Sequence, residues 1–321
     1  MNAKEIIDVK PRLVKGHRAC AGCAEPIIAK VVLSALKNDY DVVVANATCC
    51  LEVVTTIYPF SAWNIPWIHN TFENAAATLS GVETAFRALV AQKKIKPSKP
   101  VKFLAFGGDG GTYDIGLQSL SGTLERGHDI VYVCLDNEGY MNTGNQRSSA
   151  TPYGAATTTT PAGSYRPGKE QWRKNIAKIA EAHNIDYVAQ ASVHNFVDLA
   201  DKARKAFETK GPAFIVVLSP CTTLWGFSPD KTIEIARKAT ESCFWPLYEI
   251  EKGVYKINYI PSKKRPITDF IEHQKRYKHL FKPENKDIIK KIQAHVDEDW
   301  CKLQGMAELT QKLNCAKEKK W

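Results

Sequence analysis

The sequence predicts an α/β fold, in which a doubly wound, mostly parallel β-sheet is followed by a helical C-terminal extension. Three observations support this prediction. Through the first 220 residues, short apolar runs alternate with segments of helical periodicity. Motifs rich in glycine, acidic residues and cysteine directly follow several of these runs, where ligands bind in open α/β sheets. After Cys221 the alternation stops and lysine becomes abundant.

The expected strands are apolar runs bounded by turn residues, which is typical of strands buried on both faces. They cover residues 41–46, 101–107, 129–136, 186–192 and 213–219. The helices expected between them cover residues 26–37, 73–92, 113–127, 170–183 and 195–208. Helices of this length between strands imply right-handed crossovers and therefore a parallel sheet.

The later part of the chain follows another pattern. Residues 143–168 are polar and lack periodicity, so we expect a loop folded over the site, with a mobile surface loop as the alternative. A helix over 231–242, a hairpin over 246–260 with Gly253 at its turn, and lysine-rich helices complete the chain. We therefore predict two domains, residues 1–245 and the extension 246–321.

Composition restricts the class of protein. Hydrophobic residues make up 44% and charged residues 24% of the 321 residues, as in soluble globular proteins. The N-terminus lacks the apolar core of a signal peptide, and no apolar run is long enough to span a membrane. We expect a cytoplasmic protein without membrane association.

Much of the net charge of +10 lies in the extension, because residues 251–321 hold 17 Lys and Arg against 10 Asp and Glu. This surplus indicates either a docking surface for an acidic partner or, preferably, a solvated helical extension. The basic residues are interleaved with acidic ones, so we expect no nucleic-acid partner.

A glycine-rich turn, residues 107–111, follows the strand expected at 101–107. Its glycines allow the backbone to approach an anion, and a helix start follows with free N–H groups. A dinucleotide-binding fingerprint would place its acidic residue about twenty positions later, whereas Asp109 lies inside this turn. A carboxylate beside phosphate oxygens requires a cation between them. Asp109 therefore predicts Mg²⁺ or Ca²⁺.

The next expected strand ends in a second polar segment, residues 136–142. Asn137, 28 residues after Asp109, can offer a side-chain oxygen to the same ion, and Gly139 can offer its backbone carbonyl. A Gly-Asp-Gly turn paired with this asparagine is typical of proteins that bind thiamine diphosphate with Mg²⁺. The residues predicted to bind the cofactor in these two segments are Gly108, Asp109, Gly110, Gly111, Asn137, Glu138, Gly139, Tyr140, Met141 and Asn142.

The nine cysteines suggest metal ligands or buried thiols more than disulfides, since their number is odd and no secretion signal precedes them. Cys20 and Cys23 form a C-x-x-C pair, while Cys50 and Cys221 each follow an expected strand. Four thiolates could hold a [4Fe–4S] cluster or zinc, and spacing does not separate the two. Beside a thiamine cofactor, a cluster would have a task as electron acceptor.

The remaining cysteines carry weaker expectations. Neighbouring extended residues face opposite ways, so of Cys49 and Cys50 one is expected to be a packed thiol. Cys134 lies inside an expected strand and is assigned to the core. We treat the other three as incidental: Cys243, Cys301 and Cys315.

Several segments together resemble the β subunit of the 2-oxoacid:ferredoxin oxidoreductase family, and most closely its pyruvate-oxidising members. The matching segments are GHRACAGCAEP, ANATCCLEVVTTIYP, WIHNTFENAAATLSG, GGDGGTYDIGLQSLSGTLERGHD, LDNEGYMNTGNQRSSATPYGA and SPC. The resemblance covers roughly residues 15–260.

The resemblance implies specific roles. It implies a [4Fe–4S] cluster on Cys20, Cys23, Cys50 and Cys221, with Cys50 also beside the thiamine cofactor. It assigns Mg²⁺ to the Asp109 carboxylate, the Asn137 side chain and the Gly139 carbonyl. Glu25 matches a residue that contacts the cofactor, although by itself it indicates only an acidic residue at a helix N-terminus. Asn142 matches a catalytic position that faces the reactive end of the cofactor and the substrate.

The activity implied is the oxidative decarboxylation of pyruvate with coenzyme A, yielding acetyl-CoA and CO₂ and passing electrons to ferredoxin. The resemblance also implies α, γ and ferredoxin-like δ subunits, the α subunit supplying the glutamate that activates the cofactor. Ala24 and Cys49 replace glycines common among relatives of the pyruvate enzyme, which leaves 2-oxoisovalerate, 2-oxoglutarate and oxalate as alternative substrates. A non-redox thiamine enzyme with structural zinc and a non-catalytic scaffold are the remaining alternatives.

Overall fold

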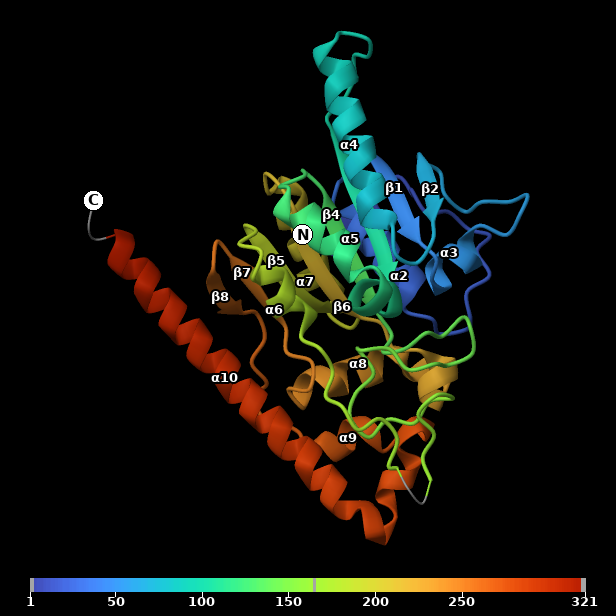
Figure 1. The fold of residues 1–321 in the computed structure, drawn as a ribbon, viewed down its shortest axis with the longest axis vertical. Helices are drawn as coiled ribbons and strands as arrows, with labels where there is room; N and C mark the ends of the chain where they lie inside the picture. The colour runs from blue at the N-terminus through green and yellow to red at the C-terminus, as the bar shows by residue number, and fades with distance from the viewer. Residues whose placement is uncertain (1–2, 164–165, 319–321) are drawn as a thin grey trace.

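The computed structural model describes residues 3–163 and 166–318. At its centre is one eight-stranded sheet with the order β2-β1-β3-β4-β6-β5-β7-β8 (Figure 1). The strands from β1 to β6 pair in parallel, and β7 and β8 are added antiparallel, which confirms the mostly parallel, doubly wound sheet. The bounds are β1 Asp41–Ala47, β2 Trp67–Asn70, β3 Val101–Gly108, β4 Val131–Asp136, β5 Tyr187–Ser192, β6 Ala213–Leu218, β7 Tyr248–Glu251 and β8 Val254–Ile257.

Helices cover both faces of this sheet. The α-helices are α1 Ala3–Ile7, α2 Glu25–Ser34, α3 Cys50–Thr55, α4 Ala75–Ala91, α5 Leu117–Glu125, α6 Ile176–Glu181, α7 Phe196–Glu208, α8 Thr232–Glu241, α9 Ile267–Ile271 and α10 Lys286–Glu318. Two π-helical turns, η1 Gly110–Ile115 and η2 Thr222–Gly226, and three 3₁₀ segments, η3 Pro229–Lys231, η4 Lys275–Phe281 and η5 Pro283–Asn285, complete the helical structure of the described residues.

The central strands divide the core into two layers. On β4, Val131 and Val133 pack into the layer that contains α2 and α7, while Tyr132 and Cys134 pack into the layer that contains α4, α5 and α6. Both faces are therefore buried, which explains why these strands are continuous apolar runs rather than alternating ones. Cys134 is completely buried, as predicted for a core residue.

Several elements differ from the sequence prediction, among them the short helices α1 and α3, which were not predicted. The edge strand β2 was not predicted, because it has only four residues and two of them, Ile68 and His69, are exposed. The helix predicted over 170–183 begins only at Ile176, where the Asn175 side chain accepts a hydrogen bond from the backbone N–H of Lys178 at 3.1 Å. The preceding residues stay non-helical and direct Arg173 into the interior.

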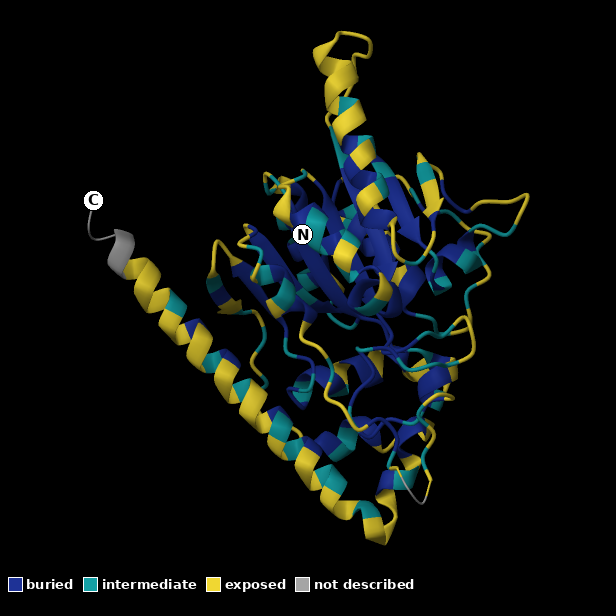
Figure 2. Cartoon of the chain, in the orientation of Figure 1, coloured by how far each residue is buried: buried dark blue, intermediate teal, exposed yellow. Residues whose placement is uncertain are grey.

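The C-terminal part contains the predicted hairpin and lysine-rich helices. Gly253 occupies the turn between β7 and β8 with a φ of 78°. Helix α10 then runs along the side of the molecule, with buried residues mainly along one edge (Figure 2). Because the hairpin extends the same sheet as residues 1–245, the division at residue 245 stays a prediction.

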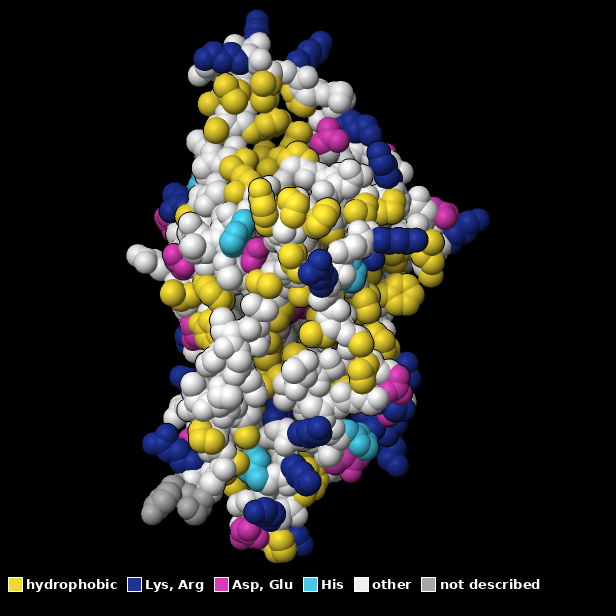
Figure 3. All heavy atoms as spheres, turned by 90° about the vertical axis from the view of Figure 1, so that its right-hand side faces the viewer, with side chains coloured by type: hydrophobic (Ala, Val, Ile, Leu, Met, Phe, Trp, Pro, Cys, Tyr) yellow, Lys and Arg dark blue, Asp and Glu magenta, His cyan; other side chains and the backbone are white. Residues whose placement is uncertain are grey.

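The surface of the described residues has one further feature. Hydrophobic side chains gather on the face shown in Figure 3. The most exposed large apolar residues include Tyr58 and Phe60, between α3 and β2, and Ile115 at the end of η1. Within residues 3–163 and 166–318, no helix has both the length and the apolar character needed to cross a membrane.

Candidate active site

The two predicted cofactor segments lie side by side at the ends of neighbouring strands. β3 and β4 pair in parallel, with Gly108 opposite Leu135, so the turns that follow them share one edge of the sheet. A pocket at this edge is lined by ten of the predicted residues together with Thr48, Cys49, Phe72 and Thr143. The ten are Cys50, Gly108, Asp109, Gly110, Gly111, Asn137, Gly139, Tyr140, Met141 and Asn142. The predicted residues Glu25 and Glu138 lie outside this lining.

The glycines of the turn have a second role besides the predicted approach to an anion. A Cβ at Gly110 would lie 2.2 Å from the Tyr140 ring, and a Cβ at Gly111 would lie 2.7 Å from the Phe72 carbonyl oxygen. The Tyr140 hydroxyl donates to the Gly110 carbonyl at 2.9 Å. The turn is thus held in place by close packing against both neighbours, which a larger residue would prevent.

Two buried oxygens in this pocket have no hydrogen-bond partner: Asp109 Oδ1 and Asn137 Oδ1. The other Asp109 oxygen accepts a hydrogen bond from Ser148, and the Gly139 backbone N–H also contacts this carboxylate. Burial, together with the nearby charge of Asp136, raises the pKa of Asp109 well above its usual value. A carboxylate and an amide oxygen, both buried and unpartnered, fit the hard oxygen ligands of Mg²⁺.

Glu25 begins α2 and lies behind Asn137. The Asn137 Nδ2 donates to Glu25 Oε1 at 2.8 Å, which leaves Asn137 Oδ1 as a free acceptor. Only 2% of Glu25 is exposed, and its Oε2 has no partner. Burial raises the pKa of Glu25 to about 7. Glu25 therefore contacts a residue of the pocket lining, while its predicted contact with the cofactor stays a prediction.

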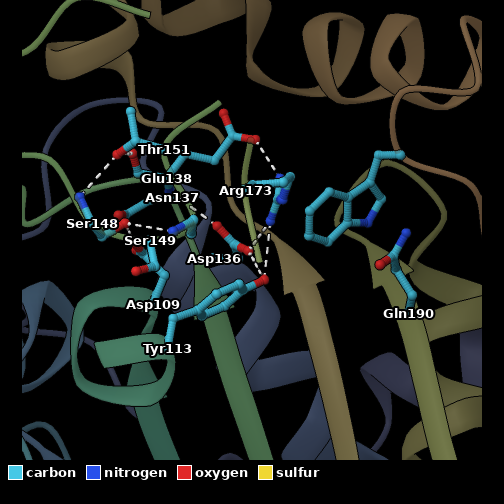
Figure 4. A network of polar contacts seen from close by, with 12 residues as sticks. Asp109, Tyr113, Asp136, Asn137, Glu138, Ser148, Ser149, Thr151, Arg173 and Gln190 are labelled. Carbon is cyan, nitrogen blue, oxygen red and sulfur yellow. Dashed lines mark hydrogen bonds and ion pairs between the residues drawn. The ribbon is translucent and has the colours of Figure 1, made fainter. Parts of the chain in front are cut away.

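Behind the pocket, the acidic residues of the same strand end are paired with arginines (Figure 4). Glu138 has a φ of 68°, and its carboxylate receives Arg173 Nη1 at 2.8 Å and Arg276 Nη2 at 2.5 Å. Asp136 Oδ2 receives Arg173 Nη2 and the Tyr113 hydroxyl, each at 2.5 Å. We call these five residues the ionic clamp. Glu138, predicted as a cofactor contact, directs its carboxylate into this clamp rather than into the pocket lining.

Arg276 shows that the C-terminal extension contributes to the site, which the sequence analysis missed. Its guanidinium lies 4.0 Å from the centre of the Trp225 ring. Trp225 Nε1 donates to the backbone carbonyl of Asn137 at 2.9 Å, so the stack supports the strand end directly. The sequence carries no local signal for this role, because the surrounding KRYKHL resembles a solvated lysine-rich segment.

The described part of the predicted loop 143–168 folds onto the site, as expected. Ser148 donates to Asp109, and Thr151 Oγ1 donates to the Glu138 carbonyl at 2.7 Å. The Ser149 backbone N–H donates to Asp114 at 2.9 Å. The loop therefore connects the ends of β3 and β4 from above the sheet edge (Figure 4).

The C-x-x-C segment docks onto the chain that follows β6. Thr222 and Thr232 donate to the carbonyls of Ala21 and Gly22 at 3.2 and 2.6 Å. A Cβ at Gly22 would lie 2.3 Å from the Pro229 carbonyl oxygen, so this contact requires glycine. The docking brings the predicted ligands Cys20 and Cys23 toward Cys221, which precedes η2.

Cys50, the fourth predicted ligand, begins α3 and interacts electrostatically with Cys23 and Cys221. Burial raises the pKa of all three thiols, and the charge of Glu25 adds to the effect. In the described ranges, no three His, Cys, Asp or Glu side chains are arranged to hold a single metal ion. The four predicted ligands are thus close enough to influence one another electrostatically, since Cys20 and Cys50 each interact with Cys23 and Cys221. Cys49 is buried, with its sulfur 3.6 Å from Asn46 Nδ2, as predicted for a packed thiol.

Comparison with known proteins agrees with this geometry. A family model described as "Thiamine pyrophosphate enzyme, C-terminal TPP binding domain" matches residues 47–217. The pyruvate synthase subunit PorB of Thermotoga maritima is 50% identical over 300 residues, which cover 93% of each chain. The ketoisovalerate oxidoreductase subunit VorB of Pyrococcus abyssi is 42% identical over 312 residues, covering 94% of this chain and 98% of that protein. Among solved structures, a 2-oxoglutarate:ferredoxin oxidoreductase from Magnetococcus marinus shares the fold, with a TM-score of 0.54 and 21% identity over 70% of each chain.

The fold and the site thus define a thiamine-pyrophosphate enzyme of the oxidoreductase class. More specifically, the chain belongs to the family of β subunits of pyruvate:ferredoxin oxidoreductase, also called PorB subunits of pyruvate synthase. It is accordingly one subunit of a larger enzyme.

Proposed function

We propose that this chain, in a cytoplasmic complex, catalyses the coenzyme A-dependent oxidation of pyruvate to acetyl-CoA and CO₂, with electrons passed to ferredoxin. The observation that carries the proposal is the pair of buried, unpartnered oxygens on Asp109 and Asn137, beside four gathered thiols. The name of the Thermotoga maritima relative, at 50% identity, supports pyruvate as the substrate.

In this proposal Asp109, Asn137 and the Gly139 carbonyl hold Mg²⁺, and the glycine turn receives the diphosphate. Thiamine diphosphate, when bound, supplies the electron sink that decarboxylation of a 2-oxoacid requires. Glu25 keeps the Asn137 amide oriented so that its oxygen stays available to the metal. Asn142, which lines the same pocket, is assigned to the reactive end of the cofactor. The loop at Ser148 closes the pocket over Asp109.

We further propose that Cys20, Cys23, Cys50 and Cys221 hold a [4Fe–4S] cluster, which accepts electrons when it is bound. A cubane cluster is wider than one ion, so its ligand sulfurs lie further apart than those of a zinc site. We assign a cluster rather than zinc because the family is one of thiamine-dependent oxidoreductases, whose chemistry needs an electron acceptor beside the cofactor. Burial disfavours the thiolate forms of Cys23, Cys50 and Cys221 in the free chain, so ligation must displace protons.

The proposal also includes α, γ and ferredoxin-like δ subunits. The exposed fractions of Tyr58 and Phe60 are 93% and 71%, and such apolar groups gather on one face (Figure 3). Large exposed apolar patches mark protein interfaces. We assign this face to the α subunit, which would supply the activating glutamate and the residues that grip the substrate carboxylate.

A second candidate keeps the chemistry and changes the substrate to 2-oxoisovalerate, because the VorB relative matches at 42% identity over nearly its whole length. The test is viologen reduction by the complete complex with pyruvate, 2-oxoisovalerate, 2-oxoglutarate and oxalate. We expect the highest kcat/KM for pyruvate. A higher value for any other acid would reject pyruvate as the substrate.

The cofactor assignments are tested on the same complex. In the purified complex we expect thiamine diphosphate, a brown chromophore and, in addition to the iron of the ferredoxin-like subunit, about four iron atoms per copy of this chain. Cys20→Ser should lose iron while retaining thiamine diphosphate, and Asp109→Ala should show the reverse pattern. Zinc without a visible chromophore would overturn the electron-transfer proposal.

A further inference from the structure

A groove lies between the loop at residues 156–162 and η4, and its charge is one-sided. Its volume is about 900 Å³. Lys275, Lys278 and Lys282 line it, and among the described residues its lining contains neither Asp nor Glu. We call this surface the lysine groove. Nothing in the proposed chemistry at the cofactor pocket uses these three lysines.

The architecture of η4 directs the charges of the groove outward. The three lysines are exposed: Lys275 and Lys278 lie one 3₁₀ turn apart on η4, and Lys282 directly follows the segment. The stem of Lys275 packs on Gly226, where a Cβ would lie 2.7 Å from it. Arg276, by contrast, is buried and paired with Glu138, so the outward charge comes from the lysines.

The groove adjoins the cysteine site. Thr223 lines the groove, and its Oγ1 lies 4.0 Å from the sulfur of Cys20. Of the four predicted cluster ligands, Cys20 is the exposed one. A molecule seated in the groove would therefore lie next to the most accessible edge of that site.

We propose that the lysine groove is the docking surface for an acidic, ferredoxin-like iron–sulfur subunit that takes electrons from the cysteine site. The inference rests on the proposed function, since it requires a cluster on the four cysteines. Clustered exposed lysines steer an acidic partner and align it. Exposed Phe281 adds an apolar contact at the rim. With a cluster on the four cysteines, each transfer would oxidise that cluster by one electron and reduce the cluster of the partner by one, without bond formation or proton transfer.

The test uses the complete complex carrying Lys275→Glu, Lys278→Glu and Lys282→Glu together. We expect the Kd of the ferredoxin-like subunit to rise by at least about 10-fold at low ionic strength. Pyruvate-dependent ferredoxin reduction should fall with it, while reduction of the small dye methyl viologen should persist. In the wild-type complex, rising salt should release the same subunit. The control carries Lys93→Glu, Lys94→Glu and Lys96→Glu, exposed residues just beyond α4, and should retain it.

The outcomes separate the alternatives. Retention of the ferredoxin-like subunit at the wild-type level by the groove variant would overturn the inference. A rise in KM for coenzyme A in the viologen assay, without loss of that subunit, would instead identify a site for a phosphorylated substrate and would also overturn it. Failure of the proposed function would appear separately, because the wild-type complex would then fail to reduce viologen with any of the four 2-oxoacids. Unchanged unfolding midpoints will exclude misfolding of the variants.

Discussion

The cofactor pocket and the ionic clamp lie at the same strand end, but they differ in whether their buried polar groups have partners. In the pocket, Asp109 and Asn137 each retain an oxygen without a partner. In the clamp, the carboxylates of Asp136 and Glu138 are both met by guanidinium groups within 2.8 Å. The pocket is therefore incomplete without a ligand, whereas both clamp carboxylates are paired within the chain alone.

This difference separates ligand binding from folding. A buried carboxylate without a cation destabilises the folded state, and a bound cation removes that cost. A buried charge network, in contrast, loses stability when one partner is removed. Substitutions in the pocket should mainly change cofactor affinity, and substitutions in the clamp should mainly change the free energy of unfolding.

The largest expected effect is that of Arg276→Gln in the clamp. It leaves Glu138 with one guanidinium in place of two and should lower the free energy of unfolding by about 3–5 kcal/mol. Urea denaturation at pH 7 measures this change. The matched control is Lys275→Gln, an exposed neighbour that should change stability by less than about 0.5 kcal/mol. The double variant Glu138→Gln/Arg276→Gln should recover part of the loss, and strictly additive losses would contradict a coupled network.

The next effect concerns the pocket. Asp109→Asn removes the charged ligand proposed for Mg²⁺ and should weaken Mg²⁺-dependent thiamine diphosphate binding by more than about 100-fold, beyond the loss typical of an outer-shell partner. The free energy of unfolding of the cofactor-free protein should not fall, because burial already disfavours the Asp109 carboxylate. Titration calorimetry with thiamine diphosphate measures the affinity, and exposed Asp230→Asn is the control. Retained affinity would remove Asp109 from the metal site.

A smaller effect is expected for Tyr113→Phe. The hydroxyl donates to Asp136 at 2.5 Å inside the clamp, so its loss should lower the free energy of unfolding by about 1–2 kcal/mol. Thiamine diphosphate affinity should stay within about 2-fold, since the pocket oxygens are untouched. Tyr58→Phe, at an exposed position, serves as the control in the same denaturation experiment. A large loss of affinity with unchanged stability would show that the two regions are not separable.

The smallest effect concerns Lys169. Its charge is hydrogen-bonded, unlike the free oxygens of the pocket, but only to backbone carbonyls rather than to an opposite charge as in the clamp. Its ammonium group is hydrogen-bonded to the carbonyls of Thr151 and Ser149 at 2.5 and 3.3 Å. Burial, with the charges of Arg147 and Arg173, lowers the pKa of Lys169 to about 8.

The sign of its pH dependence follows from that pKa. Between pH 8 and about 10.4, the unfolded chain holds the Lys169 proton and the folded chain does not, so stability rises with pH. We expect the wild type to gain stability relative to Lys169→Met over this range, measured by denaturation at several pH values. A constant difference between the two proteins would contradict the lowered pKa.

The contrast also explains what could be predicted from the sequence. The pocket residues follow two apolar runs directly, so their position at one sheet edge could be predicted from local pattern. The clamp could not, because Glu138 meets Arg173 and Arg276 at separations of 35 and 138 residues. Arg276 lies in a lysine-rich segment, so the sequence suggests a solvated side chain. Only the folded chain brings Arg276 to Glu138. The edge strand β2 was missed for another reason, since four residues with two exposed show no periodicity.

The position of Arg276 in the chain has a consequence for biosynthesis. Chains leave the ribosome from the N-terminus, at about 5–20 residues per second. The pocket segments around Asp109 and Asn137 emerge long before Arg276. In the folded chain, Arg276 supports the end of β4 through its ion pair with Glu138. The nascent chain therefore holds an unsupported cofactor loop for many seconds. Loading of the cofactor into its final geometry must wait until the chain has been translated beyond Arg276.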